Sequence, residues 1–187
     1  MKLLLHTCCA PCSIQCFESL AADGIRPDLF WYNPNIHPFT EYRLRRDSLS
    51  LFAEEKNLAL IMEDEYGLRS FIKATFPSDE NSSQEGQTRC IYCYRIRLEK
   101  TARLAAERAF DAYSTTLLIS PYQNHELIKR IGEELAVDLG VEFLYRDFRP
   151  LFREGRSQAR VAGYYMQKYC GCIYSEEERY LPRRETK

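Results

Sequence analysis

The chain has 187 residues, a length that predicts one domain, and 45% of its residues are hydrophobic, enough for a sizeable core. Its 26 basic and 27 acidic residues nearly cancel, which excludes a strongly basic protein but allows a basic patch on one face. No apolar run approaches the length of a membrane span, and the N-terminus shows no signal-peptide pattern. We therefore expect a cytoplasmic protein with no membrane partner.

Short apolar runs alternate with helical patterns along the chain. Strands are predicted at residues 3–5, 27–32, 58–62, 113–119 and 141–145. Helices are predicted at residues 13–22, 38–56, 68–76, 89–109, 124–139 and 157–168, and the polar residues 77–88 are predicted to form a loop and a candidate lid. This alternation predicts a single α/β domain over residues 1–187, an open, mostly parallel five-stranded sheet with helices on both faces and the first strand at its centre.

The pattern within residues 38–56 predicts which face of that helix is buried. Leu44, Leu51 and Phe52 fall on one stripe, which we expect to face the core. The arginines at positions 43, 45 and 46 fall mostly elsewhere, so we expect them at the surface.

The chain contains eight cysteines, and all but one of them fall into three groups. Structural disulfides are rare in the cytosol, so grouped cysteines favour metal binding or redox chemistry over a disulfide scaffold. The groups are Cys8, Cys9 and Cys12, then Cys90 and Cys93, then Cys170 and Cys172. The remaining thiol, Cys16, lies within the first predicted helix and is interpreted as core packing.

The first group lies on the turn between the first predicted strand and the first predicted helix. In an open α/β sheet that turn is at the carboxyl end of the strand, where ligands bind, and the N–H groups of the helix favour negative charge on sulfur. Three cysteines on one tight turn are too many for packing alone, so metal or redox chemistry is expected there. His6, which ends the strand, is interpreted as a core histidine whose hydrogen bonds are satisfied.

Cys90 and Cys93 form a C-x-x-C in a predicted helix, where residues i and i+3 share a face and both sulfurs can meet one metal or cluster. Zinc, iron–sulfur and dithiol sites all use this motif. A zinc ribbon usually has two such pairs. Here the partner set is Cys8 and Cys9, which fits an iron–sulfur cluster at least as well. The alternative is a pair of buried helical thiols.

Cys170 and Cys172 form a C-x-C with Gly171 between them. A disulfide across one residue closes a small, strained ring that is easily reduced, and the glycine gives the backbone the freedom that this ring needs. We interpret the pair as a two-electron thiol–disulfide couple. A pair of metal ligands and a plain turn are the alternatives.

Basic and aromatic side chains occur together near two of the cysteine groups, a pattern that suits RNA whose phosphates are held and whose unstacked base is inserted. One set is Arg149, Arg153, Arg156, Arg160 and Lys168, interleaved with Tyr164, Tyr165 and Tyr169. The other set is Arg89, Arg95, Arg97, Lys100 and Arg103. A solvated helix face is the alternative, and Arg43, Arg45 and Arg46 offer another path for RNA.

Five segments, spread over nearly the whole chain, resemble epoxyqueuosine reductase of the QueH type. They are HTCCAPC (6–12), YNPNIHP (32–38), RCIYCYRIRL (89–98), SPYQNHELI (120–128) and YCGCIYS (169–175). The joint set of C-C, C-x-x-C and C-x-C is highly specific. The resemblance implies an adenine-nucleotide hydrolase-like fold and the last step of queuosine biosynthesis, in which the epoxide oxygen of epoxyqueuosine is removed in the anticodon loop of tRNA.

The same resemblance implies the cofactors and their ligands. A [4Fe-4S] cluster would be held by Cys8, Cys9, Cys90 and Cys93, and a redox-active disulfide would join Cys170 and Cys172. A second, mononuclear iron is implied beside the cluster, with Cys12 as a candidate ligand. Removing the epoxide oxygen takes two electrons and two protons, so an external electron donor is expected.

Two other classes of function are open at this point, a zinc-stabilised RNA-binding module and a tRNA-thiolating enzyme of the same fold. The thiolating enzymes normally carry an S-G-G-x-D-S phosphate loop after the first strand, where this chain has TCCAPC (7–12), which disfavours ATP use. A zinc protein is colourless, whereas an iron–sulfur protein is brown. For a reductase, the candidate proton donors are Tyr92, Tyr169 and His6.

Overall fold

The computed structural model describes residues 1–76 and 85–181. Its five strands are all parallel and form one sheet in the order β3-β2-β1-β4-β5. The strands are β1 (Leu3–His6), β2 (Asp28–Trp31), β3 (Leu60–Met62), β4 (Ala112–Thr115) and β5 (Glu142–Phe143). The predicted open parallel sheet with a central first strand is therefore confirmed.

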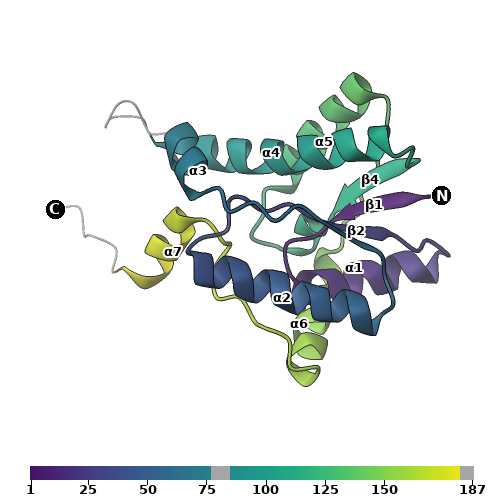
Figure 1. Cartoon of the computed structure of the whole chain (residues 1–187), viewed down its shortest axis with the longest axis horizontal. Helices are drawn as coiled ribbons and strands as arrows, with labels where there is room; N and C mark the ends of the chain where they lie inside the picture. Colours follow the sequence, from purple (N-terminus) through teal and green to yellow (C-terminus); the bar gives the residue numbers. More distant parts are fainter. Residues whose placement is uncertain (77–84, 182–187) are drawn as a thin grey trace.

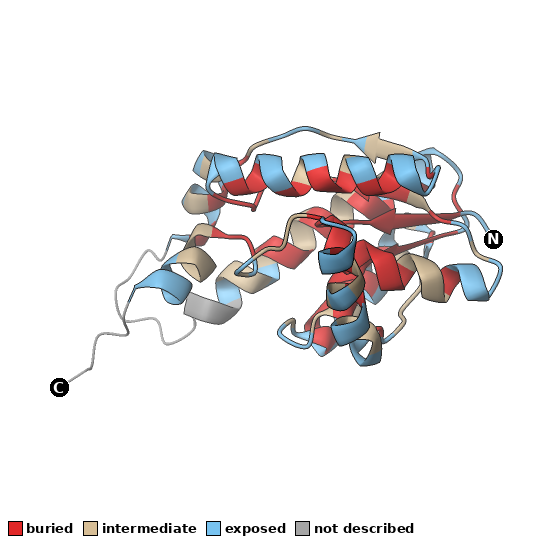
Figure 2. Ribbon diagram, turned by 90° about the horizontal axis from the view of Figure 1, so that it is seen from below, coloured by how far each residue is buried: buried red, intermediate tan, exposed pale blue. Residues whose placement is uncertain are grey.

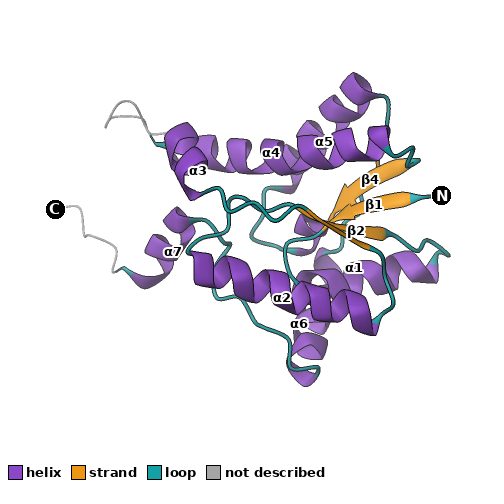
Figure 3. Cartoon of the chain, viewed as in Figure 1, coloured by secondary structure: helices purple, strands orange, loops and turns teal. Residues whose placement is uncertain are grey.

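Seven α-helices and two 3-10 helices are assigned within the described residues. The α-helices are α1 (Ala10–Ala22), α2 (Phe39–Glu55), α3 (Leu68–Thr75), α4 (Glu85–Glu107), α5 (His125–Leu139), α6 (Phe152–Val161) and α7 (Ile173–Tyr180). The 3-10 helices are η1 (Thr116–Ile119) and η2 (Arg149–Leu151). Figure 3 shows α4 and α5 on one face of the sheet and α1, α2 and α6 on the other, so both faces are covered as predicted.

The core lies between the sheet and these two helical layers. Leu3, Leu4 and Leu5 are completely buried, because β1 has helices on both faces and strands on both sides. Figure 2 shows the buried residues along the strands and on the inward sides of the helices. Each buried leucine contributes about 2 kcal/mol of hydrophobic stabilisation. The continuous apolar run at the N-terminus thus anchors the turn that follows it.

Several element boundaries differ from the predicted ones. The fourth strand ends at Thr115, because the Thr115 side chain accepts a hydrogen bond from the Leu117 N–H and turns the chain into η1. The helix predicted at residues 157–168 is observed as α6, which begins and ends earlier, at Phe152–Val161. Gly163, at φ +74°, prevents the helix from continuing. Residues 85–88 of the predicted loop belong to α4, while residues 77–84 lie outside the described part. Helix α7 was not predicted.

The predicted buried stripe of α2 is wrong in two of its three positions. Leu44 and Leu51 are 42% and 46% exposed, whereas Phe52 is buried. Arg45, expected at the surface, is only 1% exposed. Periodicity alone favoured the leucines, but Arg45 can be buried because Glu41 and backbone carbonyls neutralise and bond its guanidinium.

The carboxyl ends of the strands define the functional end of the molecule. Figure 1 shows α2 and α4 extending past these strand ends, where α3 and α7 also lie. This is the edge at which open α/β sheets bind ligands. None of the helices in the described part of the chain is long and apolar enough to cross a membrane.

Candidate metal and thiol centre

The first cysteine group is a compact triad at the carboxyl end of the central strand. β1 leads into the turn that carries Cys8 and Cys9, and Cys12 follows in the first turn of α1, which a proline helps to start. The three residues are buried, and their sulfurs lie within 4.8 Å of one another. Asn33 donates a 2.8 Å hydrogen bond to the Thr7 carbonyl and so ties this turn to the loop after β2. The triad is a preformed set of sulfur ligands.

The three thiols of the triad differ in acidity. Hydrogen bonds from Cys12 and Cys9 hold the pKa of Cys8 well below its usual range, and the positive charge of Arg45 lowers it further. Burial raises the pKa of Cys9, while the hydrogen bonds to Cys8 and Cys9, with burial, raise that of Cys12. Of the three thiols, Cys8 is thus the one whose pKa is lowered. A soft cation would displace the remaining protons.

The other two cysteine groups meet around one aromatic ring. Cys93 and Cys172 are buried against Phe71, Cys90 is half-buried and Cys170 is exposed. Helix α4 carries the first pair, and the turn before α7 carries the second. The C-x-x-C and the C-x-C, far apart in the sequence, are thus neighbours. All eight cysteines are free thiols in this structure.

Arg97 is a buried cation that interacts with a cysteine of each group, Cys93, Cys170 and Cys8. One turn after Cys93 on α4, its Nη2 donates to Cys93 Sγ at 3.0 Å and its Nε to the Cys93 carbonyl at 2.8 Å. Burial alone would lower the pKa of Arg97, but negative charge on Cys93, Cys170 and Cys8 outweighs it and raises the pKa. Within residues 1–76 and 85–181, no carboxylate pairs with Arg97. An unpaired buried ion costs of the order of several kcal/mol. Burial raises the pKa of the Cys93 thiol, so the sulfur would offset this cost once it loses its proton to a bound metal.

Arg45 is a second buried guanidinium, and it approaches from the opposite helical layer. It pairs with Glu41 at 2.7 Å, and the hydroxyl of Tyr165 donates to the other carboxylate oxygen. Its Nη1 and Nη2 donate to the carbonyls of Cys170 and Tyr169 at 2.9 and 3.0 Å. Burial would lower the pKa of Arg45, but the thiols of the triad and Glu41 raise it. Two guanidiniums with one carboxylate leave a positive field that suits thiolates.

The turn through Gly171 is held by hydrogen bonds on several sides. The N–H of His37 donates to the Gly171 carbonyl at 2.7 Å, and the Gly171 N–H donates to the Ser175 hydroxyl at 3.1 Å. That hydroxyl in turn donates to the Cys172 carbonyl at 2.8 Å. Gly171 has φ +141°, and a Cβ there would lie 3.2 Å from Nη1 of Arg45. The position therefore requires glycine.

His6 and Tyr169 already use their protons in the fold. His6 Nε2 donates to the Tyr32 carbonyl at 3.2 Å, so Nδ1 accepts from the Thr115 hydroxyl at 2.9 Å. Burial and Arg97 lower the pKa of His6 to about 4, which makes it neutral and confirms the interpretation as a satisfied core histidine. The Tyr169 hydroxyl donates to the His37 carbonyl at 2.7 Å. Both residues are therefore disfavoured as proton donors.

Tyr92, the third candidate donor, lines a cavity of about 150 Å³. The lining residues are Tyr32, Pro34, Glu65, Gly67, Ser70, Phe71, Tyr92 and Ile96. Because Phe71 also packs on Cys93 and Cys172, the Phe71 ring lies between the cavity and these two cysteines.

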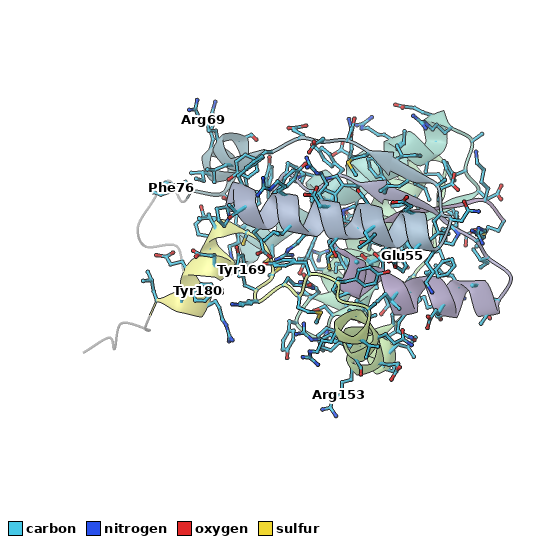
Figure 4. The ribbon with its side chains drawn as sticks, turned by 60° about the horizontal axis from the view of Figure 1, so that its bottom comes forward. Glu55, Arg69, Phe76, Arg153, Tyr169 and Tyr180 are labelled. Atoms are coloured by element: carbon cyan, nitrogen blue, oxygen red, sulfur yellow. The ribbon has the colours of Figure 1, made fainter. Side chains whose placement is uncertain are left out.

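The two predicted basic surfaces differ in how many cations are free. On α4, Arg97 is buried, and the other cations have acidic partners: Arg89 with Glu178, Arg95 with Glu134, Lys100 with Glu63 and Arg103 with Glu99. Around α6, Arg149 pairs with Asp147 and lowers the pKa of that carboxyl to about 2. Arg153, Arg160 and Lys168 are exposed and, within the described part, have no acidic partner. Figure 4 shows Arg153 pointing outward from α6.

The tyrosines that interleave with these cations are structural. Tyr164 is buried and donates to Glu55, Tyr165 donates to Glu41, and Tyr169 is held as described above. Tyr122, which the sequence reasoning missed, is 84% exposed and lies edge-on to Phe152 at 5.9 Å between ring centroids. It is therefore an aromatic side chain beside α6 that a base can reach.

Sequence reasoning also missed the polar side chains that bond the sulfurs. Gln123 donates to Cys170 Sγ at 3.2 Å, and Gln167 donates to Cys12 Sγ at 3.3 Å. Neither glutamine lies at a sequence spacing from its cysteine that would predict the contact. Arg97 does, because it lies four residues after Cys93 and a helix brings i and i+4 together. Cys16 is fully buried, as predicted.

Comparisons with known proteins identify the family. The family model described as epoxyqueuosine reductase QueH matches residues 3–178. A QueH protein of Dehalococcoides mccartyi is 37% identical over 179 residues, covering 96% of this chain and 94% of that protein. One of Thermotoga maritima is 35% identical and covers 95% and 91%, and one of Acinetobacter baylyi is 36% identical and covers 93% and 80%. The chain therefore belongs to the epoxyqueuosine reductase QueH family, a family of oxidoreductases.

Proposed function

We propose that this protein reduces epoxyqueuosine to queuosine in the anticodon loop of tRNA. In this proposal Cys8, Cys9, Cys90 and Cys93 hold a [4Fe-4S] cluster, and Cys170 and Cys172 are a redox-active pair that forms and opens a disulfide. The family assignment supports the reaction. The observation that carries the cofactor proposal is Arg97, a buried cation that has no carboxylate partner among the described residues, donates to Cys93 Sγ and interacts electrostatically with Cys8.

The proposed ligands are all thiols, as an iron–sulfur cluster requires, but the sulfurs that lie within 4.8 Å of one another are those of Cys8, Cys9 and Cys12, and Cys90 and Cys93 are not among them. Cys8 and Cys9 converge in the buried triad, and Cys90 and Cys93 share one side of α4 at i,i+3 spacing. Cys12, third in the triad and bonded by Gln167, is the candidate ligand of a second, mononuclear iron. When bound, a cluster would supply single electrons and an iron would supply a Lewis acid for the epoxide oxygen. Two buried guanidiniums would stabilise the negative charge of such a thiolate-rich site.

The Cys170–Cys172 pair matches the reaction in its electron count. Joining two thiols in a disulfide releases two electrons and two protons, the number that converts the epoxide to an alkene and water. Cys170 is exposed and Cys172 is buried beside Cys93, so the pair spans from solvent to the proposed ligand set. An external donor then restores the dithiol.

The exposed side of α6 is the proposed tRNA surface. Arg153, Arg160 and Lys168, which have no acidic partner in the part of the chain that the structure describes, offer positive charge for phosphates, and Tyr122 offers an exposed ring for stacking. Tyr122 directly precedes Gln123, which bonds Cys170. A base stacked on Tyr122 would therefore lie near the exposed thiol. The four α4 cations that have acidic partners, Arg89, Arg95, Lys100 and Arg103, are not part of this proposed surface.

The proposal is tested by anaerobic turnover of tRNA that contains epoxyqueuosine, with dithionite as the donor and mass spectrometry of the released nucleosides. The parent protein is expected to remove one oxygen. Cys170→Ser and Cys172→Ser should keep the visible absorption of the cluster and lose turnover. Cys16→Ser, which alters a buried thiol outside the three groups, is the matched control and should keep both. A cluster-loaded parent protein that leaves the epoxide intact would refute the function.

A further inference from the structure

The two thiols of the C-x-C have different surroundings. Cys170 is exposed, whereas Cys172 is 7% exposed and packs against Phe71. An external thiol reaches an exposed sulfur far more readily than a buried one. The two residues of the C-x-C therefore differ in how far solvent reaches them.

Gln123 adds a directed hydrogen bond to the exposed sulfur. Its Nε2 donates to Cys170 Sγ at 3.2 Å, and its Oε1 accepts from the Tyr94 hydroxyl at 2.7 Å. The Tyr94 oxygen already accepts from the Asn124 N–H at 3.2 Å, so its own proton goes to Gln123. This relay fixes the amide with its N–H toward sulfur. Asn124 also caps α5 by accepting from the Leu127 N–H at 3.0 Å, which holds the whole segment in place.

We propose that Gln123 is a positioning residue that makes Cys170 the sulfur through which the C-x-C pair exchanges electrons with an external dithiol, while Cys172 is the buried partner. This inference rests on the redox role given to the pair in the proposed function. The Gln123 N–H stabilises negative charge on Cys170 Sγ, because a hydrogen bond to an ionised group is about twice as strong as a neutral one.

The exchange is balanced in two steps. A thiolate of the dithiol attacks Cys170 Sγ, forms a new S–S bond and breaks the Cys170–Cys172 bond, and the electron pair leaves on Cys172 sulfur, which takes up a proton. The second thiolate of the reductant then attacks the sulfur that the reductant contributes to the mixed disulfide. Cys170 leaves as the thiolate that Gln123 stabilises and is protonated afterwards. The pair gains two electrons and two protons, and the dithiol becomes a cyclic disulfide.

The assignment predicts which thiol of the reduced, cofactor-loaded protein reacts with 5,5′-dithiobis(2-nitrobenzoate). Peptide mass spectrometry should find the label on Cys170 at least about tenfold faster than on Cys172. Labelling of Cys172 first would overturn the proposal.

The role of Gln123 is tested in a Cys172→Ser background. Gln123→Leu removes the donor and should slow labelling of Cys170 about threefold, since a less stabilised thiolate is scarcer but more nucleophilic. Gln123→Glu has the same shape but points a carboxylate at the sulfur, so it should be slower than Gln123→Leu. Tyr94→Phe, which frees the amide to turn, should fall between the parent and Gln123→Leu.

The matched control is Gln167→Glu, because Gln167 donates to Cys12 and not to the C-x-C. It should leave the labelling rate of Cys170 unchanged. If Gln123→Glu, with an unchanged melting temperature, reacts at the parental rate, Gln123 has no electrostatic role and the proposal fails. If the labelling follows the prediction but Cys170→Ser still reduces epoxyqueuosine tRNA, the thiol assignment holds and the redox role in the proposed function fails.

Discussion

Arg45 on α2 donates a 2.9 Å hydrogen bond from Nη1 to the backbone carbonyl of Cys170. The bond joins the helical layer on one face of the sheet to the turn that carries the C-x-C. Arg45 also pairs with Glu41, and Tyr165 occupies the other oxygen of that carboxylate. The buried ion pair therefore holds the backbone of the C-x-C turn in place.

Arg45→Met should destabilise the protein by about 3–5 kcal/mol, because it leaves Glu41 buried without its partner. Urea unfolding measures this change. The double variant Glu41→Gln with Arg45→Met should recover part of the loss, and Arg43→Met, at an exposed position of the same helix, should change stability by less than about 0.5 kcal/mol. A single variant as stable as the parent would show that the ion pair is not needed to hold the turn.

Gly171→Ala should be more costly than an ordinary glycine substitution. A Cβ at Gly171 lies 3.2 Å from Arg45 Nη1 and 3.3 Å from Ile36 Cγ1, whereas a Cβ at Gly163 meets open space. Both glycines have positive φ. Gly163→Ala should therefore cost about 1 kcal/mol for its backbone alone, and Gly171→Ala about 1–3 kcal/mol more. Equal melting temperatures for the two variants would contradict the close packing of Arg45 on this turn.

Stability should fall as pH is lowered because His37 is buried and neutral. Burial lowers the pKa of His37 from 6.5 to about 4. Between these values the unfolded chain binds a proton that the folded protein does not, so this contribution is present above pH 6.5 and is lost as pH falls toward 4. When this contribution is lost completely, the free energy of unfolding falls by about 3 kcal/mol. Urea unfolding of the parent between pH 7 and pH 4.5 should show a steeper loss than that of His37→Gln, and parallel curves would be inconsistent with this burial.

The tRNA surface is tested by reversing charge on α6. Arg153→Glu with Arg160→Glu should weaken binding of tRNA at least about tenfold. The slope of log affinity against log salt concentration should also become shallower, by the contribution of about two phosphate contacts. The matched control is Arg103→Glu with Arg130→Glu, the same change of charge on α4 and α5, on the other face of the sheet. Binding curves of the two double variants that coincide across a salt series would remove α6 from the RNA interface.

The sheet could be predicted from the sequence because the patterns that indicate its strands and turns are local. The apolar run at Leu3–Leu5 and the turn residues after each helix are read within a few positions, and the parallel order follows from the alternation. The cysteine groups were visible for the same reason. What the sequence could not show was long-range: that Arg45 is buried, that Gln123 bonds a sulfur far along the chain, and that Tyr164 and Tyr165 are held by carboxylates.

The boundaries failed where a side chain overrode a pattern. Thr115 looks like the middle of a β-branched strand, yet its hydroxyl accepts from the Leu117 N–H and ends the strand. The apolar spacing of α2 pointed to Leu44 and Leu51 because periodicity cannot recognise a buried arginine that has a partner. Burial of Arg45 depends on Glu41 and on carbonyls near Cys170, and only the fold brings these together.

The measurement that tests the central claim most directly is the iron and acid-labile sulfide content of protein purified without oxygen, for the parent, Cys93→Ser and Cys16→Ser. We predict a brown parent with about four irons and four sulfides for the cluster, more iron if the second site is filled, and loss of most of both in Cys93→Ser. Cys16→Ser should match the parent. A colourless parent that contains zinc, or a Cys93→Ser variant with full iron and sulfide, would contradict the account.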